Sequence, residues 1–314
     1  MATAALALMA PAQEGAGKRA LVTGLAGFTG RYLERELRAA GYEVHGTTTP
    51  GHPAASGLAS NLYSVDLTDR AAVAAMVAQV RPDVVAHLAG IAFVGHADVE
   101  QFYRVNVVGT RHLLEALAGL AHQPSAVLLA SSANIYGNTS VPVIDENVPA
   151  APANDYAVSK LAMEYMARLW QDKLPLIITR PFNYTGVGQH ENFLLPKIVG
   201  HFRRRATDIE LGNLHVWRDF SDVRMVAASY RALLAAAPAG QTFNICSGRA
   251  HSLGEALDMM AEIAGYRINV HVNPAFVRAN EVERLTGDNR RLAAVVGALS
   301  PPPLAATLRW MYEA

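Results

Sequence analysis

The chain has 314 residues, of which 51% are hydrophobic and 17% charged, so it can bury the core of one large domain or two small ones. Its 27 Lys and Arg balance its 27 Asp and Glu, which excludes a long-range field toward nucleic acid or an anionic membrane and favours a small-molecule partner held by local charges. The single cysteine, Cys246, excludes an internal disulfide and predicts a reducing compartment, the cytoplasm.

The first 17 residues are expected to form a disordered leader outside the folded domain. Their apolar patch, in "MATAALALMAPA", is short and follows no positively charged segment, which argues against an export signal. No apolar run elsewhere in the sequence reaches the roughly 20 residues that a membrane-spanning helix needs. The sequence therefore predicts a soluble protein without a membrane partner.

From Lys18 onward, short β-rich runs alternate with longer segments of helical periodicity. The strand-like runs are "RALVTG" (19–24), "YEVHGT" (42–47), "NLYSVD" (61–66), "DVVAHLAG" (83–90), "SAVLLASS" (125–132), "LPLIITRP" (174–181) and "TFNICSG" (242–248). Between the first six lie helical patterns, among them residues 30–41, 69–82, 98–120 and 156–172. Such alternation predicts an α/β fold with a Rossmann-like, doubly wound parallel sheet.

The pattern becomes irregular after Pro181, returns to a strand near residue 242, and ends in short helices and a Pro-rich segment. This change predicts a smaller C-terminal substrate-binding lobe made of two separated segments. We expect residues 18–182 plus about 220–250 to form the dinucleotide-binding domain, and about 183–219 plus 251–314 to form the lobe.

The first strand is followed by a glycine-rich turn, "LVTGLAGFTGRYL". Gly24, Gly27 and Gly30 would let the backbone approach a pyrophosphate and direct helix N–H groups at it, with Phe28 and Thr29 in the same turn. The spacing differs from G-x-G-x-x-G, but the strand-turn-helix context is the one this motif requires. The turn predicts a bound NAD or NADP.

The end of the second strand, "VHGTTTPGH", lacks the acidic residue that binds the adenosine ribose hydroxyls of NAD, which favours NADP. Thr47 and Thr48 could accommodate the 2′-phosphate, and Arg31 could reach it from the helix start. Asp66 and Leu67, at the end of the third strand, are expected to flank the adenine.

The catalytic signal lies in "DYAVSKLAMEY", where Tyr156 and Lys160 are four residues apart and therefore share one helix face. An ammonium near a phenol should lower the phenol pKa and let it exchange a proton with a substrate oxygen. Ser132, at the end of the strand "SAVLLASS", would add a hydroxyl beside them. Together with a glycine-rich first turn, these residues predict acid–base chemistry coupled to hydride transfer.

These motifs, in this order, resemble those of the extended short-chain dehydrogenase/reductases that modify nucleotide sugars, over residues 18 to about 310. The resemblance implies that Ser132 donates a hydrogen bond to the reacting oxygen, that Tyr156 is the acid/base, and that Lys160 also binds the nicotinamide ribose. It further implies that Asn106 supports the active-site geometry and that Leu88, Ala89 and Gly90 lie along the cofactor. The family also suggests a homodimer in which helices near 98–118 and 153–172 form a four-helix bundle.

Later segments, such as "TRPFNYTGVGQHENFLLPKIV" and "IELGNLHVWRDFSDV", resemble the substrate segments of GDP-mannose 4,6-dehydratases and, more closely, of GDP-6-deoxy-4-keto-D-mannose reductases. The resemblance implies a GDP-linked keto sugar as partner. The residues that would contact it are Asn134, Asn183, Asn192, Lys197, Arg218, Arg278 and Glu281. The sequence departs from the pattern at Ala92 and Phe93, which indicate a more apolar sugar pocket, and at Tyr184. Because of these departures, a residue next to each one listed remains an alternative for the sugar contact.

Asn134 narrows the reaction. The dehydratases carry a glutamate two residues after the catalytic hydroxyl, and an amide cannot exchange a proton at neutral pH, so reduction of an existing 4-keto group is favoured over dehydration. A 4-epimerase with tightly held NAD, a 4,6-dehydratase and a non-enzymatic dinucleotide-binding module remain alternatives. The sequence does not decide between a hexose and a heptose substrate, nor does it fix the configuration of the product at C4.

His190 resembles a general acid of epimerase-reductases, but those also use a cysteine where this chain has Ala133. Its catalytic role stays open. No cluster of His, Cys and acidic residues has metal-binding spacing, so no metal is expected.

Overall fold

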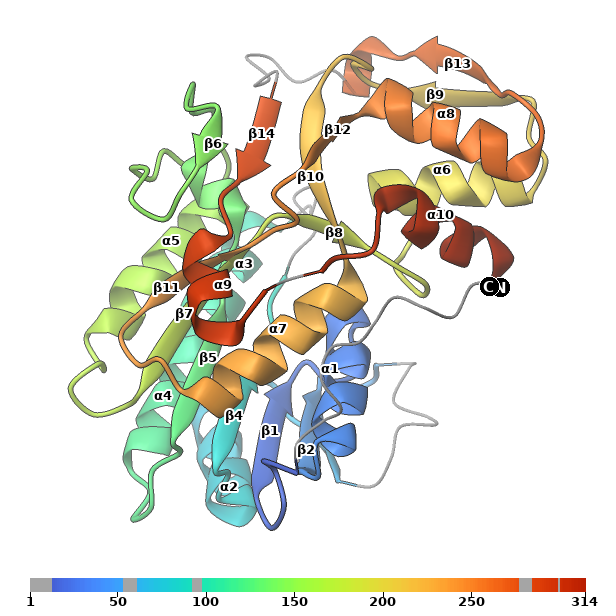
Figure 1. Cartoon of the computed structure of the whole chain (residues 1–314). Helices are drawn as coiled ribbons and strands as arrows, with labels where there is room; N and C mark the ends of the chain where they lie inside the picture. Colours follow the sequence, from blue (N-terminus) through green and yellow to red (C-terminus); the bar gives the residue numbers. More distant parts are fainter. Residues whose placement is uncertain (1–12, 53–60, 92–97, 277–283, 299) are drawn as a thin grey trace.

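The computed structural model describes residues 13–52, 61–91, 98–276, 284–298 and 300–314. Two parts are visible in Figure 1: a large sheet with helices on both faces, and a smaller lobe of short strands and helices above it. The predicted residues Ala92, Phe93, Arg278 and Glu281 lie outside the described residues.

The large sheet has seven parallel strands in the order β11-β7-β5-β4-β1-β2-β3. Its strands are β1 (Arg19–Thr23), β2 (Glu43–Thr48), β3 (Leu62–Ser64), β4 (Val84–His87), β5 (Ala126–Ala130), β7 (Leu176–Pro181) and β11 (Thr242–Ile245). The chain winds outward from β1 in one direction and, from β4, in the other. This confirms the predicted doubly wound α/β fold and places its topological switch point between β1 and β4.

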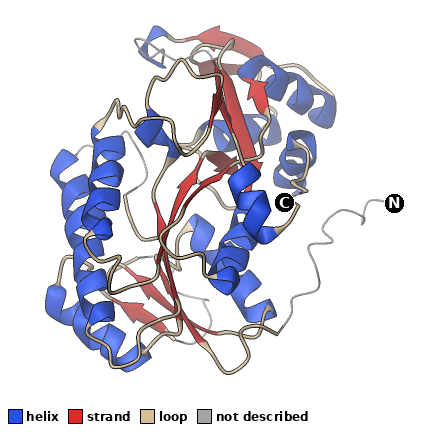
Figure 2. Cartoon of the chain, turned by 60° about the vertical axis from the view of Figure 1, so that its left-hand side comes forward, coloured by secondary structure: helices blue, strands red, loops and turns tan. Residues whose placement is uncertain are grey.

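Helices cover both faces of this sheet (Figure 2). One face carries α1 (Phe28–Ala39), α7 (Val223–Ala236) and α9 (Arg290–Val296), and the other carries α2 (Arg70–Val80), α4 (Thr110–Ala118) and α5 (Asp155–Arg168). Successive residues of β1 point to opposite faces: Ala20 and Val22 join the core under α1 and α7, whereas Leu21 joins the core under α2 and α4. Burial on both faces explains why these strands read as continuous apolar runs.

The helix expected over residues 98–120 is interrupted. It begins as α3 (Val99–Tyr103), continues as a π-helical segment over Arg104–Gly109, and returns to α-helix in α4. Segments of π-helix are rare and occur often at functional sites. This wider π-helical turn contains Asn106, whose side chain reaches the segment that follows β4.

The smaller lobe contains a sheet in the order β12-β10-β14-β6, with β8 paired to β10, and a separate β13-β9 pair. Its strands are β6 (Val143–Ile144), β8 (Asn183–Thr185), β9 (Asp208–Leu211), β10 (Trp217–Asp222), β12 (Ala250–Ser252), β13 (Asn269–Val272) and β14 (Arg284–Gly287). The helices α6 (Leu194–Arg203), α8 (Leu253–Ala264) and α10 (Leu304–Glu313) share one apolar core beside it.

Three short segments depart from the predicted division of the chain. β6, from the first segment, pairs with β14 of the lobe, whereas Leu292 of α9 packs into the core of the large sheet. Residues 13–17 of the predicted leader contact the folded domain: Glu14 forms an ion pair with Arg231 at 2.6 Å. Among the described residues, no helix is both long and apolar enough to cross a membrane.

A buried ion pair joins α5 to β7. The Arg180 guanidinium donates to both carboxylate oxygens of Glu164, at 3.0 and 2.7 Å, and both side chains are almost completely buried. Arg180 also donates to the Tyr136 hydroxyl at 3.0 Å. The ion pair therefore fixes α5, β7 and the turn that contains Tyr136 relative to one another.

We predict that Glu164→Gln lowers the free energy of unfolding by about 3–5 kcal/mol, because it leaves the Arg180 charge buried without its counter-charge. Urea denaturation would measure the loss. Asp258→Asn is the matched control: Asp258 pairs with Arg267 at 2.9 Å, but both side chains are exposed, so its loss should cost less than about 1 kcal/mol. Equal costs for the two variants would contradict the prediction.

Candidate active site

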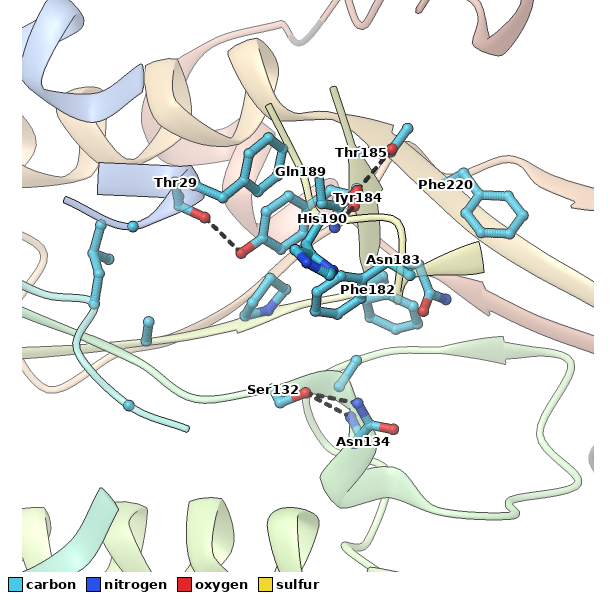
Figure 3. A pocket seen from close by; sticks show the side chains of 18 of the residues that line it. Thr29, Ser132, Asn134, Phe182, Asn183, Tyr184, Thr185, Gln189, His190 and Phe220 are labelled. Carbon is cyan, nitrogen blue, oxygen red and sulfur yellow. Dashed lines mark hydrogen bonds between the residues drawn. The ribbon is translucent and has the colours of Figure 1, made fainter. Parts of the chain in front are cut away.

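A cleft of about 1430 Å³ opens at the carboxyl ends of the large sheet and extends to the smaller lobe. Single drug-sized ligands usually occupy pockets of about 300–1,000 Å³, so this cleft can hold a dinucleotide and a second ligand together. Ser132 and Asn134 lie on one wall, and Phe182, Asn183, Tyr184 and His190 face them from the other (Figure 3). Binding at this edge is the rule for doubly wound sheets.

The glycine-rich turn lines one end of the cleft and fits a diphosphate. Gly24 has a φ of +70°, and a Cβ there would lie 2.9 Å from the Ala89 backbone. A Cβ on Gly30 would lie 2.5 Å from the Gly24 carbonyl oxygen. Helix α1 starts after Gly27 without a side-chain cap and without an acid in its first turn, so its N–H groups and positive end can meet an anion. All five predicted turn residues line the cleft: Gly24, Gly27, Phe28, Thr29 and Gly30.

Asn106 stabilises the segment after β4. Its Oδ1 accepts a hydrogen bond from the Ile91 N–H at 3.0 Å, and its Nδ2 donates to Ser159 Oγ on α5 at 3.0 Å. A Cβ on Gly90 would lie 2.8 Å from Asn106 Oδ1 and 3.2 Å from Lys160 Nζ. Leu88 and Gly90 line the cleft, while the Ala89 N–H donates to Thr23 Oγ1 behind it.

Ser132, Tyr156 and Lys160 come together at the centre of the cleft. Ser132 follows β5, whereas Tyr156 and Lys160 stand one turn apart on α5, and all three side chains are buried. The Lys160 ammonium donates to the Ala130 carbonyl oxygen at 2.8 Å. The Ser132 hydroxyl is close enough to Tyr156 to influence the pKa of its phenol.

The pKa shifts differ from the expectation. Burial raises the pKa of Tyr156 to about 12, and the Ser132 hydroxyl offsets only part of this increase. Burial also lowers the pKa of Lys160 to about 8, with the Glu164 carboxylate opposing it. The prediction that Lys160 brings the phenol below its ordinary pKa is therefore wrong here, because loss of hydration outweighs any attraction by the ammonium. Tyr156 therefore keeps its proton at neutral pH.

Only some of the residues predicted to contact the sugar diphosphate lie together in the cleft. Asn134, Asn183 and Arg218 line the cleft, and Arg218 also donates to its neighbouring Trp217 carbonyl at 2.8 Å. Asn192 and Lys197 do not line it, and the Lys197 ammonium donates to the Glu210 carbonyl at 2.8 Å. Helix α6 buries its Leu195, Ile198 and Val199 face in the lobe, and this helical phase turns Lys197 toward β9.

Of the residues predicted for the adenosine end, Thr47, Thr48 and Leu67 are buried and Asp66 is exposed. Thr47 Oγ1 accepts the Gly24 N–H at 3.2 Å, and the buried Thr48 hydroxyl has no hydrogen-bond partner. Asp66 Oδ1 accepts the N–H of Thr68 at 2.8 Å, and Leu67 is buried next to Gly109. None of these four residues lines the cleft, but Arg31, Arg35 and His52 do.

Sequence reasoning missed Ser131 as a cleft residue, and it noted Tyr184 only as a departure from the family pattern. The Ser131 hydroxyl is buried without a hydrogen-bond partner and lines the cleft beside Ser132; the serine pair at the end of β5 was the available signal. Tyr184 stacks on Phe28 with an interplanar angle of 11°, and its hydroxyl is 2.8 Å from Thr29 Oγ1. Tyr184 thus links the smaller lobe to the glycine-rich turn, as Figure 3 shows.

The charge of the cleft is one-sided. Its described lining includes Arg31, Arg35, Arg218, Lys160, His52 and His190 but no aspartate, glutamate or cysteine. Such a lining suits anionic ligands and offers tyrosine, lysine and histidine for proton transfer. The described part of the chain contains no group of three His, Cys, Asp or Glu residues that could hold a metal ion.

Comparison with known proteins agrees with this geometry. The chain is 33% identical to a GDP-6-deoxy-D-talose 4-dehydrogenase of Aggregatibacter actinomycetemcomitans, over 88% of this chain and 90% of that protein. It is 32% identical to a GDP-6-deoxy-D-mannose reductase of Pseudomonas aeruginosa, over 89% and 91%.

Two solved structures match almost the whole chain. One, a protein of Burkholderia cenocepacia J2315 with the provisional name of an epimerase, is 56% identical with a TM-score of 0.90, covering 95% of this chain and 98% of that one. The other, RMD from Pseudomonas aeruginosa complexed with NADPH, is 30% identical with a TM-score of 0.82, covering 94% and 98%. The model of the NAD dependent epimerase/dehydratase family matches residues 20–246, and the chain belongs to this family.

Proposed function

We propose that the protein is a nucleotide-sugar ketoreductase, which uses NAD(P)H to reduce the 4-keto group of a GDP-4-keto-6-deoxy sugar. The observation that carries this proposal is a cleft that combines Ser132, Tyr156 and Lys160 with a glycine-rich turn but has no carboxylate among its described lining residues. Elimination of water needs a residue that exchanges a proton with carbon, whereas ketone reduction needs only a hydride and a proton for oxygen.

The side chains divide the work as follows. When bound, NAD(P)H supplies the hydride. Tyr156, protonated at neutral pH, gives its proton to the C4 oxygen, and the Ser132 hydroxyl stabilises the charge that develops on that oxygen. Lys160 is held by the Ala130 carbonyl beside Gly90, in position to bind a ribose and to stabilise the phenolate left on Tyr156.

The names of two relatives support a GDP-linked 6-deoxy sugar: one is a 4-dehydrogenase of GDP-6-deoxy-D-talose, which names C4 as the reacting carbon, and the other is a GDP-6-deoxy-D-mannose reductase. Arg218 and Asn183 are our candidates for the sugar diphosphate, since a guanidinium can bind two phosphate oxygens at once. Arg278 and Glu281 remain predictions for the same ligand. A 4-epimerase is the second candidate, and the provisional name of the Burkholderia protein favours it.

NADP is the proposed cofactor. Arg31 and Arg35 lie on the first turns of α1, and His52 follows β2, so three basic side chains line the part of the cleft next to the glycine-rich turn. A 2′-phosphate adds negative charge that such a group can meet. Thr48, with a buried hydroxyl that has no partner, remains a candidate on the same side.

A homodimer is also proposed. Half of the ten exposed large hydrophobic side chains among the described residues lie on α3, the π-helical segment and α5, or directly after it: Val99, Val108, Val158, Tyr165 and Leu169. Val158, Tyr165 and Leu169 follow helical spacing, and Leu169 is 81% exposed. A second copy of this surface would cover them as a four-helix bundle.

The reaction is tested with GDP-4-keto-6-deoxy-mannose and NADPH, which should yield a GDP-6-deoxy sugar with one NADPH consumed per product. Tyr156→Phe should lower kcat by about 10²- to 10⁴-fold with little change in NADPH affinity, and Ser132→Ala should cost less. NMR of the product reports its C4 configuration. Conversion of GDP-mannose alone to its 4-keto-6-deoxy form would show a dehydratase instead, and turnover without net NADPH consumption would show an epimerase.

The cofactor is tested by fluorescence titration. We expect NADPH to bind at least as tightly as NADH, and Arg31→Ala to weaken NADPH binding more than NADH binding. Arg38→Ala is the control, because Arg38 lies on the same helix but pairs with Glu34 outside the cleft. A tenfold preference for NADH, about 1.4 kcal/mol, would contradict the NADP assignment.

The dimer is tested by light scattering at micromolar concentration. The protein should have twice the mass of one chain, and Leu169→Glu should shift it toward monomer, because the charge would be buried at the interface. Val272→Glu is the control, since Val272 is 56% exposed on β13, far from this surface in the chain. A monomeric parent protein would refute the interface.

A further inference from the structure

The hydroxyl of Ser132 has two donors aimed at it from a single residue. The backbone N–H of Asn134 donates to Ser132 Oγ at 3.2 Å, and the Asn134 carboxamide Nδ2 donates to the same oxygen at 3.1 Å. Both contacts are visible in Figure 3. A serine hydroxyl has two lone pairs and one proton, so these contacts use its whole accepting capacity and leave only the proton.

The geometry points to Asn134 as a positioning residue of the ketoreductase reaction: by filling both lone pairs of Ser132 Oγ, it makes that hydroxyl a donor only, whose single proton is left for the reacting oxygen of the substrate. This inference rests on the proposed function, which gives Ser132 and Tyr156 their roles. It assigns the amide of Asn134 to the protein's own hydroxyl, whereas the resemblance assigned it to the substrate.

The turn that holds Asn134 is rigid. It is a short 3-10 helix, Ala133–Tyr136, whose Ile135 and Tyr136 are completely buried. The Tyr136 hydroxyl donates to Asn244 Oδ1 at 2.7 Å and accepts from Arg180. Asn134 itself is exposed to the cleft, so its replacement should leave the fold intact.

The chemistry explains why an amide suits this position. In the direction of reduction, Ser132 must present its one proton to the substrate oxygen that gains negative charge. A carboxylate beside Ser132 Oγ would accept the serine proton instead. The serine would then turn a lone pair toward the substrate oxygen, and the stabilisation of the developing charge would be lost.

Asn134→Asp tests the direction of the hydrogen bond, because it keeps the shape of the side chain and replaces the donor with an acceptor. We expect kcat at neutral pH to fall about 10²-fold, the typical cost of removing one donor to a developing oxyanion, while KM changes little. In alcohol oxidation, where Tyr156 must first lose its proton, the rise of the rate with pH should move to higher pH. A wild-type kcat and pH profile for Asn134→Asp would overturn the inference.

A double-mutant cycle tests whether Asn134 acts through Ser132. Asn134→Ala should lower kcat by about tenfold or less in the parent protein, and should have no effect in a Ser132→Ala background. Asn183→Ala is the matched control: it removes another cleft amide, which we propose binds the sugar diphosphate, and its effect should be the same in both backgrounds. Thermal unfolding checks that each variant is folded.

The outcomes separate the two proposals. If the parent protein reduces the keto sugar but Asn134→Ala costs the same factor with and without Ser132, Asn134 contacts the substrate, and the positioning role is wrong while the function stands. If the parent protein shows no NAD(P)-linked turnover of any keto-sugar nucleotide, the proposed function is wrong and the positioning role is overturned with it.

Discussion

The ion pair between Glu164 and Arg180 is the interaction on which the site depends most. Glu164 lies one turn beyond Lys160 on α5. Arg180 is the last residue but one of β7, and it reaches Tyr136 in the turn that follows Ser132. The catalytic groups therefore stand on two elements that one buried guanidinium holds together. Burying two charges is costly, and the cost is offset only because the contact is bidentate and Arg180 has further acceptors in Tyr136 and the Glu146 carbonyl.

The same burial determines the protonation of the site. Tyr156 and Lys160 are both shielded from water, and in each case this favours the neutral form. For the phenol, the result is a retained proton, which is the state a reductase needs before hydride arrives. For the amine, the Glu164 carboxylate opposes the loss of charge, so the ion pair that fixes the geometry also supports the ammonium. Structure and proton chemistry thus depend on one carboxylate.

Whether a feature could be predicted from the sequence depends on how far apart in the chain its interacting residues lie. The glycine-rich turn and the Tyr156–Lys160 spacing are local patterns, and the structure places both at the cleft as expected. The pairing of β6 with β14 joins very short strands that are far apart in the chain, and neither gives a periodic signal. Lys197 was misplaced because a motif fixes a residue's position along the chain, whereas the phase of α6 against its core decides where the side chain points.

The pKa of Tyr156 was misjudged for a related reason. A lysine four residues away suggests a lowered phenol pKa, but the balance between attraction and lost hydration depends on burial, which arises only when α5 packs against β5 and the lobe closes the other wall. The π-helical turn has the same origin. Its sequence continues an ordinary helical pattern, and the extra residue is tolerated because Asn106 gains partners on Ile91 and Ser159.

The absence of acidic side chains from the described cleft lining connects these observations. The two phosphate-bearing ligands that we propose for this cleft need positive charge, and a carboxylate beside Ser132 would both repel them and compete for the serine proton. An amide at position 134 avoids both effects and still provides a donor. A glutamate at this position could exchange a proton with carbon, whereas an asparagine cannot, and its amide instead fixes the direction of a hydrogen bond. In the function we propose, the residue that argues against dehydration is therefore also the one that prepares the hydroxyl for reduction.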